Sequence, residues 1–167
     1  MRAGALGRIG AIAASAGLIG CYSFTGASVP PHLKTIAIPT VEDQSTFGEP
    51  GVRERMTTEL TTLFLTDNSF QVADRGTADA VLKGVITNIT DAPAAVEQGE
   101  TVRSRRITMS AKFTFQDMKF RKTLWEKTFS NWGDYPVTGG SSQRRVGLDE
   151  AMKKITEDVL LETVSGW

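Results

Sequence analysis

The chain has 167 residues, of which 40% are hydrophobic and 23% charged, a composition that indicates one folded domain and excludes a disordered tail or a fibrous repeat. Nineteen basic residues balance nineteen acidic ones, so there is no overall positive field to gather nucleic acid. The single cysteine, Cys21, and the single histidine, His32, exclude a disulfide framework and a structural zinc site, and we expect neither a metal nor a cofactor.

The N-terminus has the pattern of a secretory signal. Residues 1–8 contain two arginines and no acid, and residues 9–19 form a run of eleven small or aliphatic residues. This run is too short to span a bilayer, which needs about 20 apolar residues. We therefore predict a signal peptide over residues 1–20, and its removal leaves seventeen basic and nineteen acidic residues, a net charge of −2.

The predicted signal ends in Leu18-Ile19-Gly20-Cys21, which is similar to a bacterial lipobox. In a lipobox the cysteine thiol receives a lipid and becomes the new N-terminus, and a thiol has the nucleophilicity that this reaction requires. We expect Cys21 to carry covalent lipid, with acyl chains such as palmitate holding the chain on a membrane. Tyr22 stands where an Asp would favour retention at the inner membrane, so this resemblance implies the periplasm-facing side of the outer membrane.

The mature chain begins with an irregular, lipidated tether over residues 21–33, which contains three glycine or proline residues. Hydrophobic periodicity then predicts the first elements. In chain order these are a strand over 34–38, a loop over 40–51, an amphipathic helix from Val52 to about Thr66 and a strand over 70–73.

The second half is predicted to be mostly strand. The clearest pattern is the strict alternation of apolar and polar residues from Arg106 to Gln116, which gives one apolar and one wet face. Gly84 indicates a bulge or close packing. The predicted elements are a strand over 80–89, a turn over 91–100, the alternating strand, a basic turn over 117–123, a strand over 124–132, a long Gly/Ser loop over 133–147 and a helix from Leu148 with Asp149 and Glu150 in its first turn.

This order predicts a single α+β domain over residues 34–167. We expect a two-layer sandwich, with two helices packed on one face of a mixed, mainly antiparallel sheet of four to five strands. The opposite face of the sheet should stay open.

Catalytic chemistry is sparse. A Ser or Cys nucleophile needs a nearby base, but His32 lies in the tether and Cys21 is expected to be lipidated. Glycine patterns that bind phosphate or dinucleotides are absent. The acidic pairs Glu42-Asp43 and Asp149-Glu150 leave a cell-wall hydrolase as an enzymatic alternative. We interpret the chain as a binding or assembly protein and not as an enzyme.

Basic residues are nevertheless grouped along the alternating strand and the following turn. Arginine offers a rigid fork of donors that matches phosphate, so a local anion site is one interpretation, and a solvated strand end that discourages edge pairing is the other. Two interpretations also apply to the aromatic residues Trp125, Phe129 and Trp132. We expect at least one of them in the core and at least one facing a partner. The grouped residues are Arg103, Arg105, Arg106, Lys112, Lys119, Arg121 and Lys122.

Three segments resemble the LptE family of lipopolysaccharide-assembly lipoproteins, in its Bacteroidetes and Chlorobi branch. They are Cys21 to Gly26, Leu33 to Pro39 and Ala78 to Gly84. The resemblance implies two helices on a four-stranded mixed sheet. It also implies an outer-membrane lipoprotein that plugs the LptD β-barrel, helps that barrel assemble and contacts lipopolysaccharide during transport to the cell surface.

Family members bind lipopolysaccharide phosphates through basic residues near strand turns and before the last helix. Here the turn over 91–100 carries Glu97 and Glu100 instead of bases. The resemblance therefore points to other positions, which are Arg105, Arg106, Arg144 and Arg145, followed by Lys119, Arg121 and Lys122. The alternative is a secretion or channel lipoprotein of CsgG-like type, because residues 34–39, the amphipathic helix, and residues 72–75 and 78–84 also resemble its small domains. A channel subunit would form a ring, whereas a plug is present as one copy per barrel.

Overall fold

The computed structural model describes residues 29–94, 103–138 and 140–165. The lipobox cysteine Cys21, the predicted signal peptide, and Glu97 and Glu100 lie outside these residues. The elements are β1 (Thr35–Ala37), β2 (Glu42–Asp43), α1 (Val52–Asp67), β3 (Gln71–Val72), β4 (Ala80–Pro93), β5 (Ser104–Asp117), β6 (Lys122–Pro136) and α2 (Gly140–Ser165).

The strands form one six-stranded sheet in the order β3-β1-β4-β5-β6, and β2 pairs with β4 off this path. The pairs β1/β3, β1/β4 and β2/β4 are parallel, whereas the long ladders β4/β5 and β5/β6 are antiparallel. The α+β class and the mixed sheet are confirmed. The predicted strand count was too low, and three of the five pairings are parallel, because the short strands near the N-terminus join the sheet through crossovers.

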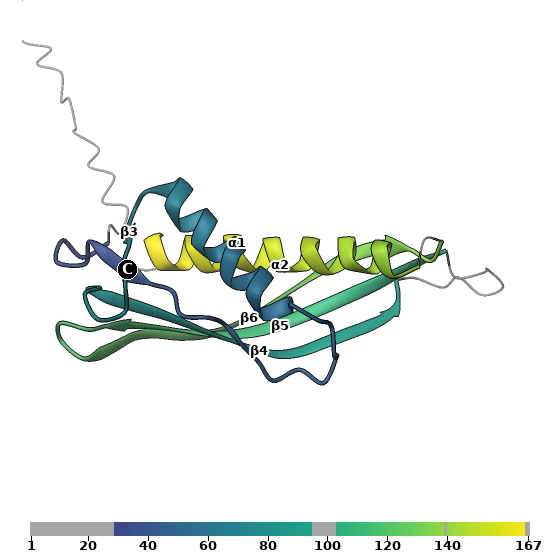
Figure 1. Cartoon of the computed structure of the whole chain (residues 1–167), viewed down its shortest axis with the longest axis horizontal. Helices are drawn as coiled ribbons and strands as arrows, with labels where there is room; N and C mark the ends of the chain where they lie inside the picture. Colours follow the sequence, from purple (N-terminus) through teal and green to yellow (C-terminus); the bar gives the residue numbers. More distant parts are fainter. Residues whose placement is uncertain (1–28, 95–102, 139, 166–167) are drawn as a thin grey trace, which may run out of the picture.

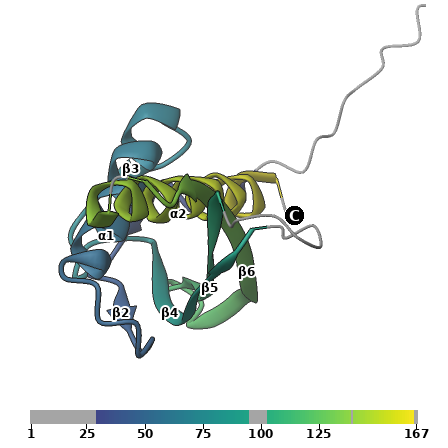
Figure 2. The ribbon, with the colours of Figure 1, turned by 90° about the vertical axis from the view of Figure 1, so that its right-hand side faces the viewer.

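Both helices lie on the same side of the sheet (Figures 1 and 2). Helix α2 runs along the length of β5 and β6, and α1 crosses it. The core between the layers contains Met56, Leu60 and Phe64 from α1 and Phe113 and Phe115 from β5. No helix in the described part of the chain covers the opposite face, so that face is open as expected.

Strand β5 follows the predicted alternation along its whole length. Ile107, Met109, Ala111, Phe113 and Phe115 are fully buried, while the residues between them are half-buried on the other face. Gly84 on β4 allows close packing, because a Cβ built there would lie 2.5 Å from Cε1 of Phe113. The irregularity in the β4/β5 register lies further along, between Ile86 and Asn88.

Helix α2 begins at Gly140, and β6 continues to Pro136, so the predicted loop over 133–147 is wrong. Sequence reasoning treated Gly133 and Gly147 as loop residues because glycine weakens strands and helices. In the fold these glycines let α2 approach β6 closely, since a Cβ at Gly133 would lie 2.0 Å from the Gly147 carbonyl oxygen. Asp149 and Glu150 consequently lie in the third turn of the helix and not in the first.

Two smaller differences concern the ends of elements. The predicted loop over 40–51 contains β2, which is only two residues long and therefore has no detectable period. Strand β4 extends past the predicted end at 89 to Pro93. Helix α1 matches its predicted bounds and ends where Asn68 adopts a left-handed conformation and donates its N–H to the Phe64 carbonyl. None of the helices in the described segments combines the length and apolar character that a membrane crossing requires.

Candidate functional site

The seven basic residues expected to bind an anion separate into two groups at opposite ends of the sheet. Arg105, Arg106, Arg144 and Arg145 lie where β4 leads toward β5 and β6 leads into α2 (Figure 1). Lys119, Arg121 and Lys122 lie at the β5–β6 turn. The eleven residues of β5 between these groups, 107–117, span about 37 Å at the usual strand rise, so one phosphate cannot contact both groups.

Arg105 and Arg144 line one pocket of about 320 Å³, which we call the arginine pocket. They come from β5 and from the second turn of α2, so the tertiary fold brings them together. The remaining lining residues are Asp91, Tyr135, Val137, Gly140 and Ser141. The last two belong to the first turn of α2, and the first-turn N–H groups of a helix have no acceptor within the helix itself.

Arg105 is fixed in the arginine pocket by Asp91. Its Nε donates to Asp91 Oδ1 at 2.8 Å and one terminal nitrogen donates to the Asp91 carbonyl at 3.1 Å. The Tyr135 hydroxyl donates to the other carboxylate oxygen at 2.6 Å. Asp91, followed by Tyr135, raises the pKa of Arg105, so the guanidinium stays charged. Burial, together with the bond to Asp91, raises the pKa of Tyr135, so the hydroxyl remains a donor.

Arg144 belongs to a cluster of three arginines around the buried carboxylate of Glu49. Its terminal nitrogen lies 2.9 Å from Glu49, whereas Arg55 and Arg145 each lie 3.9 Å away. The Arg144 guanidinium also stacks over Phe47 at 5.4 Å. Nε of Arg144 and one terminal nitrogen of Arg55 are buried without a hydrogen-bond acceptor in the described structure. The cluster therefore has more donors than acceptors.

Arg106 and Arg145 do not line the arginine pocket, and Arg106 points to the opposite face of the sheet from Arg105. Arg106 forms a bidentate pair with Asp134 at 2.7 and 2.8 Å and lies over the Trp132 ring at 5.1 Å. This pairing lowers the pKa of Asp134 and raises that of Arg106. Arg145 is the more available residue, because its side chain is 63% exposed and its nearest carboxylate is 3.9 Å away. Arg144 and Arg145 both lie in α2 and not in the long loop in which they were expected.

The arginine pocket has the donors that a phosphate or carboxylate oxygen requires. Its floor holds two arginines and one aspartate, and an additional donor on Arg144 has no acceptor. Charged hydrogen bonds of this kind are roughly twice as strong as neutral ones. The pocket is therefore suited to one anionic group.

The second group, at the β5–β6 turn, is differently arranged. Lys119 is neutralised by Asp79 at 2.8 Å and also donates to the His32 carbonyl at 2.8 Å. Arg121 and Lys122 are exposed and have no acidic partner among the described residues. The carboxylate of Asp117, buried beneath the turn, lies 2.6 Å from Nε2 of His32.

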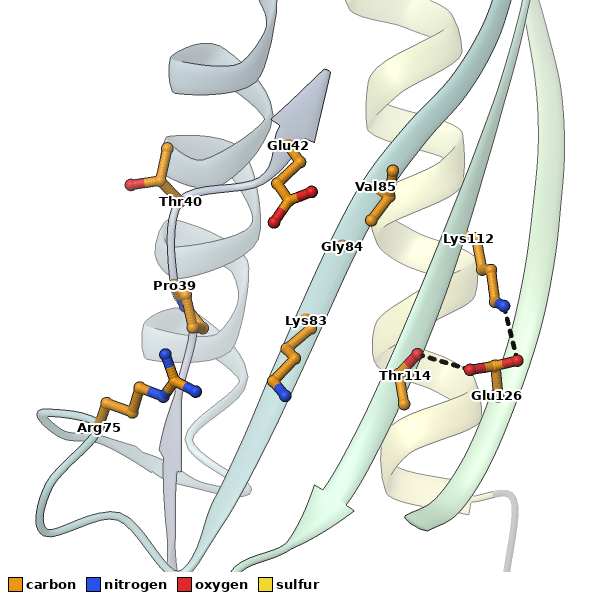
Figure 3. A pocket seen from close by; sticks show the side chains of 10 residues that line it. All are labelled: Pro39, Thr40, Glu42, Arg75, Lys83, Gly84, Val85, Lys112, Thr114 and Glu126. Atoms are coloured by element: carbon orange, nitrogen blue, oxygen red, sulfur yellow. Dashed lines mark hydrogen bonds and ion pairs between the residues drawn. The ribbon is translucent and has the colours of Figure 1, made fainter. Parts of the chain in front are cut away.

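Sequence reasoning missed a third basic site on the open face of the sheet, a groove of about 380 Å³ (Figure 3). Arg75 and Lys83 point toward each other across it, and neither has an acidic partner in the described part of the chain. Lys112 faces the same groove but is paired with Glu126 at 2.7 Å. Period-2 alternation along β4 could have placed Lys83 on the wet face, but nothing local places Arg75 beside it.

Three of the four aromatic residues of β6 divide as expected between core and surface. Trp125 and Phe129 pack half-buried against the core, and Trp132 is 45% exposed.

The acidic residues Asp149 and Glu150 offer no shared site, because Asp149 pairs with Arg55 and Glu150 with Lys154. No group of three or more metal-ligating side chains occurs in the described segments.

The family model for LptE, described as lipopolysaccharide-assembly, matches residues 33–163. The chain belongs to the LptE family. This match covers both helices, all six strands and both groups of basic residues. LptE is a family of lipopolysaccharide-assembly lipoproteins and not a known family of enzymes, which agrees with the interpretation of this chain as an assembly protein. No curated protein sequence matches this LptE-family chain.

Several solved structures share the fold of this LptE-family chain. Protein XCC0632 from Xanthomonas campestris has a TM-score of 0.57 at 9% identity, over 83% of this chain and 91% of that one. The dodecameric PelC from Paraburkholderia phytofirmans has a TM-score of 0.55 at 14% identity, over 83% and 95%. A minor lipoprotein from Acinetobacter baumannii has a TM-score of 0.52 at 14% identity, over 82% and 94%. At these identities the similarity concerns the fold alone.

Proposed function

We propose that this LptE-family chain is an outer-membrane lipoprotein, anchored through lipid on Cys21, that plugs an LptD-like β-barrel. In this role it helps the barrel assemble and contacts lipopolysaccharide on its way to the cell surface. The observation that carries the proposal is the family match, which extends over residues 33–163 and therefore over all six strands and all but the last two residues of α2.

The open face of the sheet supports the plug role. Its side chains are mostly polar or charged, including Lys83, Lys112 and Glu126, so this face can line a water-filled lumen without burying unpaired apolar surface. The two helices seal the other face with a complete hydrophobic core. The domain can therefore fold before it meets the barrel and then enter it as a rigid body.

The arginine pocket is the proposed contact for a lipopolysaccharide phosphate. Arg105 and Arg144 line the pocket, the buried Nε of Arg144 still lacks an acceptor, and Arg145 is the neighbour of Arg144 on the exposed side of the helix. Phosphate offers the oxygen geometry that arginine forks match. Lys119, Arg121 and Lys122 lie too far along the sheet to share this phosphate.

The plug role is tested by purifying the tagged, lipidated protein from its own outer membrane in mild detergent, with mass spectrometry of the proteins and of Cys21. We expect one large β-barrel protein at one-to-one stoichiometry, together with lipopolysaccharide and an acylated Cys21. Recovery of the chain without a barrel would reject the plug, and an unmodified Cys21 would reject the lipid anchor.

The ligand site is tested separately with purified lipopolysaccharide. Arg144→Gln should weaken binding about tenfold, because a charged hydrogen bond contributes about 1.5–3 kcal/mol. Lys153→Gln is the matched control, since Lys153 lies on the same helix, is exposed and has its only carboxylate at 4.0 Å. Dephosphorylated lipopolysaccharide should abolish the difference between the two variants. Equal affinity of Arg144→Gln and the unmodified chain would assign the phosphate to another site.

The second candidate function is that of a subunit in an oligomeric secretion complex of CsgG-like type. The observation that favours it is the fold similarity to PelC, whose structure is a dodecamer. Under this alternative the purified protein should form a ring and carry no LptD-like barrel. Oligomeric state therefore separates the two functions.

A further inference from the structure

The β5–β6 turn carries two large apolar side chains in solvent. We call residues Met118–Lys122 the β5–β6 tip. The Phe120 side chain is 71% exposed and Met118 is 40% exposed, on a loop that is otherwise made of charged residues. Phe120 is the most exposed of the large hydrophobic residues described in this fold.

Specific contacts hold Phe120 in its exposed position. Its backbone N–H donates to Oδ1 of the buried Asp117 at 2.9 Å, and its ring contacts the edge of His32, with centroids 4.8 Å apart. The Met118 N–H donates to the Asp79 carbonyl at 2.8 Å. Arg121 closes the turn at a φ of 53°, a left-handed conformation that costs a non-glycine residue about 1–2 kcal/mol. The turn that carries the two exposed apolar side chains therefore includes a backbone conformation that lowers the stability of the fold.

Positive charge surrounds these apolar side chains. Arg121 and Lys122 are exposed and have no acidic partner in the described part of the chain, whereas Lys119 is neutralised by Asp79. Exposed apolar side chains beside unpaired cations are typical of surfaces that bind anionic lipid headgroups. The apolar groups enter the interface, and the cations contact the phosphates.

The β5–β6 tip also lies at the end of the molecule that the N-terminal segment reaches. His32 contacts Asp117 and Phe120, and its carbonyl accepts from Lys119. His32 comes eleven residues after Cys21, and this stretch spans at most about 40 Å when extended. A lipid on Cys21 therefore keeps this tip within that distance of the bilayer, while the arginine pocket lies at the other end of the sheet (Figure 1).

We propose that the β5–β6 tip docks on an anionic phospholipid surface, with Phe120 and Met118 entering the interface and Arg121 and Lys122 contacting lipid phosphates. It forms a second membrane contact beside the lipid anchor and sets which end of the domain faces the bilayer. The orientation rests on the proposed anchor at Cys21, but the affinity of the tip for lipid does not.

The tip is tested without its anchor, as the full chain with Cys21→Ser, by flotation with vesicles of phosphatidylglycerol and phosphatidylethanolamine that contain neither lipopolysaccharide nor a barrel. Phe120→Ser should reduce binding about tenfold through lost apolar burial. Replacing Arg121 and Lys122 by Ser should reduce vesicle binding about fivefold for each charge removed at low salt, and by less at high salt. Val146→Ser, which removes a 55% exposed side chain from the other end of the fold, should leave binding unchanged.

A depth measurement gives a second readout. In the Cys21→Ser chain, Met118→Cys and Val137→Cys each introduce the sole thiol, at opposite ends of the sheet. A nitroxide at 118 should collide with oxygen dissolved in the bilayer, and one at 137 should stay accessible to aqueous reagents. Binding unaffected by Phe120→Ser, or a water-accessible label at 118, would overturn the tip proposal. Crosslinking of 118 to the barrel in the native complex would assign the tip to the barrel wall. The plug and the arginine pocket would survive each of these results.

Discussion

Asp79 links the start of the sheet to the β5–β6 turn. Its carboxylate accepts the backbone N–H groups of Lys34 and Thr35 at 2.9 and 3.1 Å, and Lys119 lies 2.8 Å away. Its own N–H donates to the Thr35 hydroxyl at 2.8 Å. The bond from Lys119, followed by the backbone donors, holds the pKa of Asp79 far below its ordinary value. One side chain thereby aligns β1, β4 and the turn.

We expect Asp79→Asn to lower the free energy of unfolding by about 1–3 kcal/mol at pH 7, the range of charged hydrogen bonds. Because the folded-state pKa is lowered, the carboxylate stabilises the fold above the ordinary Asp pKa of about 3.9. This stabilisation is lost as the pH falls below that value toward the folded-state pKa. Urea titrations at pH 7 and pH 3 should show a smaller difference for the variant than for the parent chain.

The control for this titration is Asp74→Asn, because Asp74 is an exposed turn residue whose carboxylate makes no hydrogen bond or ion pair in the described structure. This variant should retain the full pH dependence of the parent chain. If Asp79→Asn were equally sensitive to acid, the junction at Asp79 would not be the source of the acid-labile stability.

The packing of α2 on β6 depends on two glycines that face each other. A Cβ at Gly133 would lie 2.0 Å from the Gly147 carbonyl oxygen and 2.8 Å from Cβ of Glu150. Both obstacles belong to a helix that also packs on β5, so they cannot move aside independently. Close approach at this point also carries the first turns of α2 to the arginine pocket, because Arg144 is only three residues before Gly147.

Gly133→Ala should therefore destabilise the fold by about 3 kcal/mol, at the upper end of the cost of overpacking a core. Gly76→Ala is the matched control, since a Cβ there has no atom within 4 Å and the change should stay within about 0.5 kcal/mol. Thermal and urea unfolding measure both changes. A neutral Gly133→Ala would mean that α2 can shift on the sheet and that the arginine pocket is not fixed by this contact.

At the scale of the whole molecule, the long sheet separates two chemically distinct ends. One end holds the arginine pocket, and the other holds the β5–β6 tip beside the segment that leads to Cys21. The proposed plug would thereby face lipid at one end and bind a phosphate group at the other. In a ring, by contrast, neighbouring subunits would have to cover part of the open sheet face or of the helices.

We expect the purified lipoprotein, separated from any barrel, to sediment in detergent as a single chain across its working concentrations. The open sheet face carries mostly polar and charged side chains, whereas the interfaces of stable oligomers tend to be more apolar. Analytical ultracentrifugation or native mass spectrometry gives the stoichiometry. A ring of many copies would favour the CsgG-like alternative over the plug.

The sequence by itself determined the strongly periodic elements and the class of the fold. The alternation in β5 and the spacing in α1 were sufficient because each element buries one face, and burial imposes a period on the residues. The resemblance carried by Leu33 to Pro39 and Ala78 to Gly84 also led to the LptE family, which the family match confirms. Arg105 and Arg144 were named from the sequence, and the fold places them in one pocket.

Only the tertiary structure decided the structural role of two glycines and showed which charged side chains are paired. Gly133 and Gly147 were predicted to lie in a loop because glycine weakens regular structure. In the fold, the contact between α2 and β6 requires Gly133 and leaves little room for a side chain at Gly147. The pairing of Arg106 with Asp134 and of Lys119 with Asp79 joins residues far apart in the chain, so no local pattern could reveal that their charges are balanced. Likewise Arg75 and Lys83 meet only because parallel strands bring their segments side by side. Long-range pairing, which leaves no period in the sequence, therefore set the electrostatics of this protein.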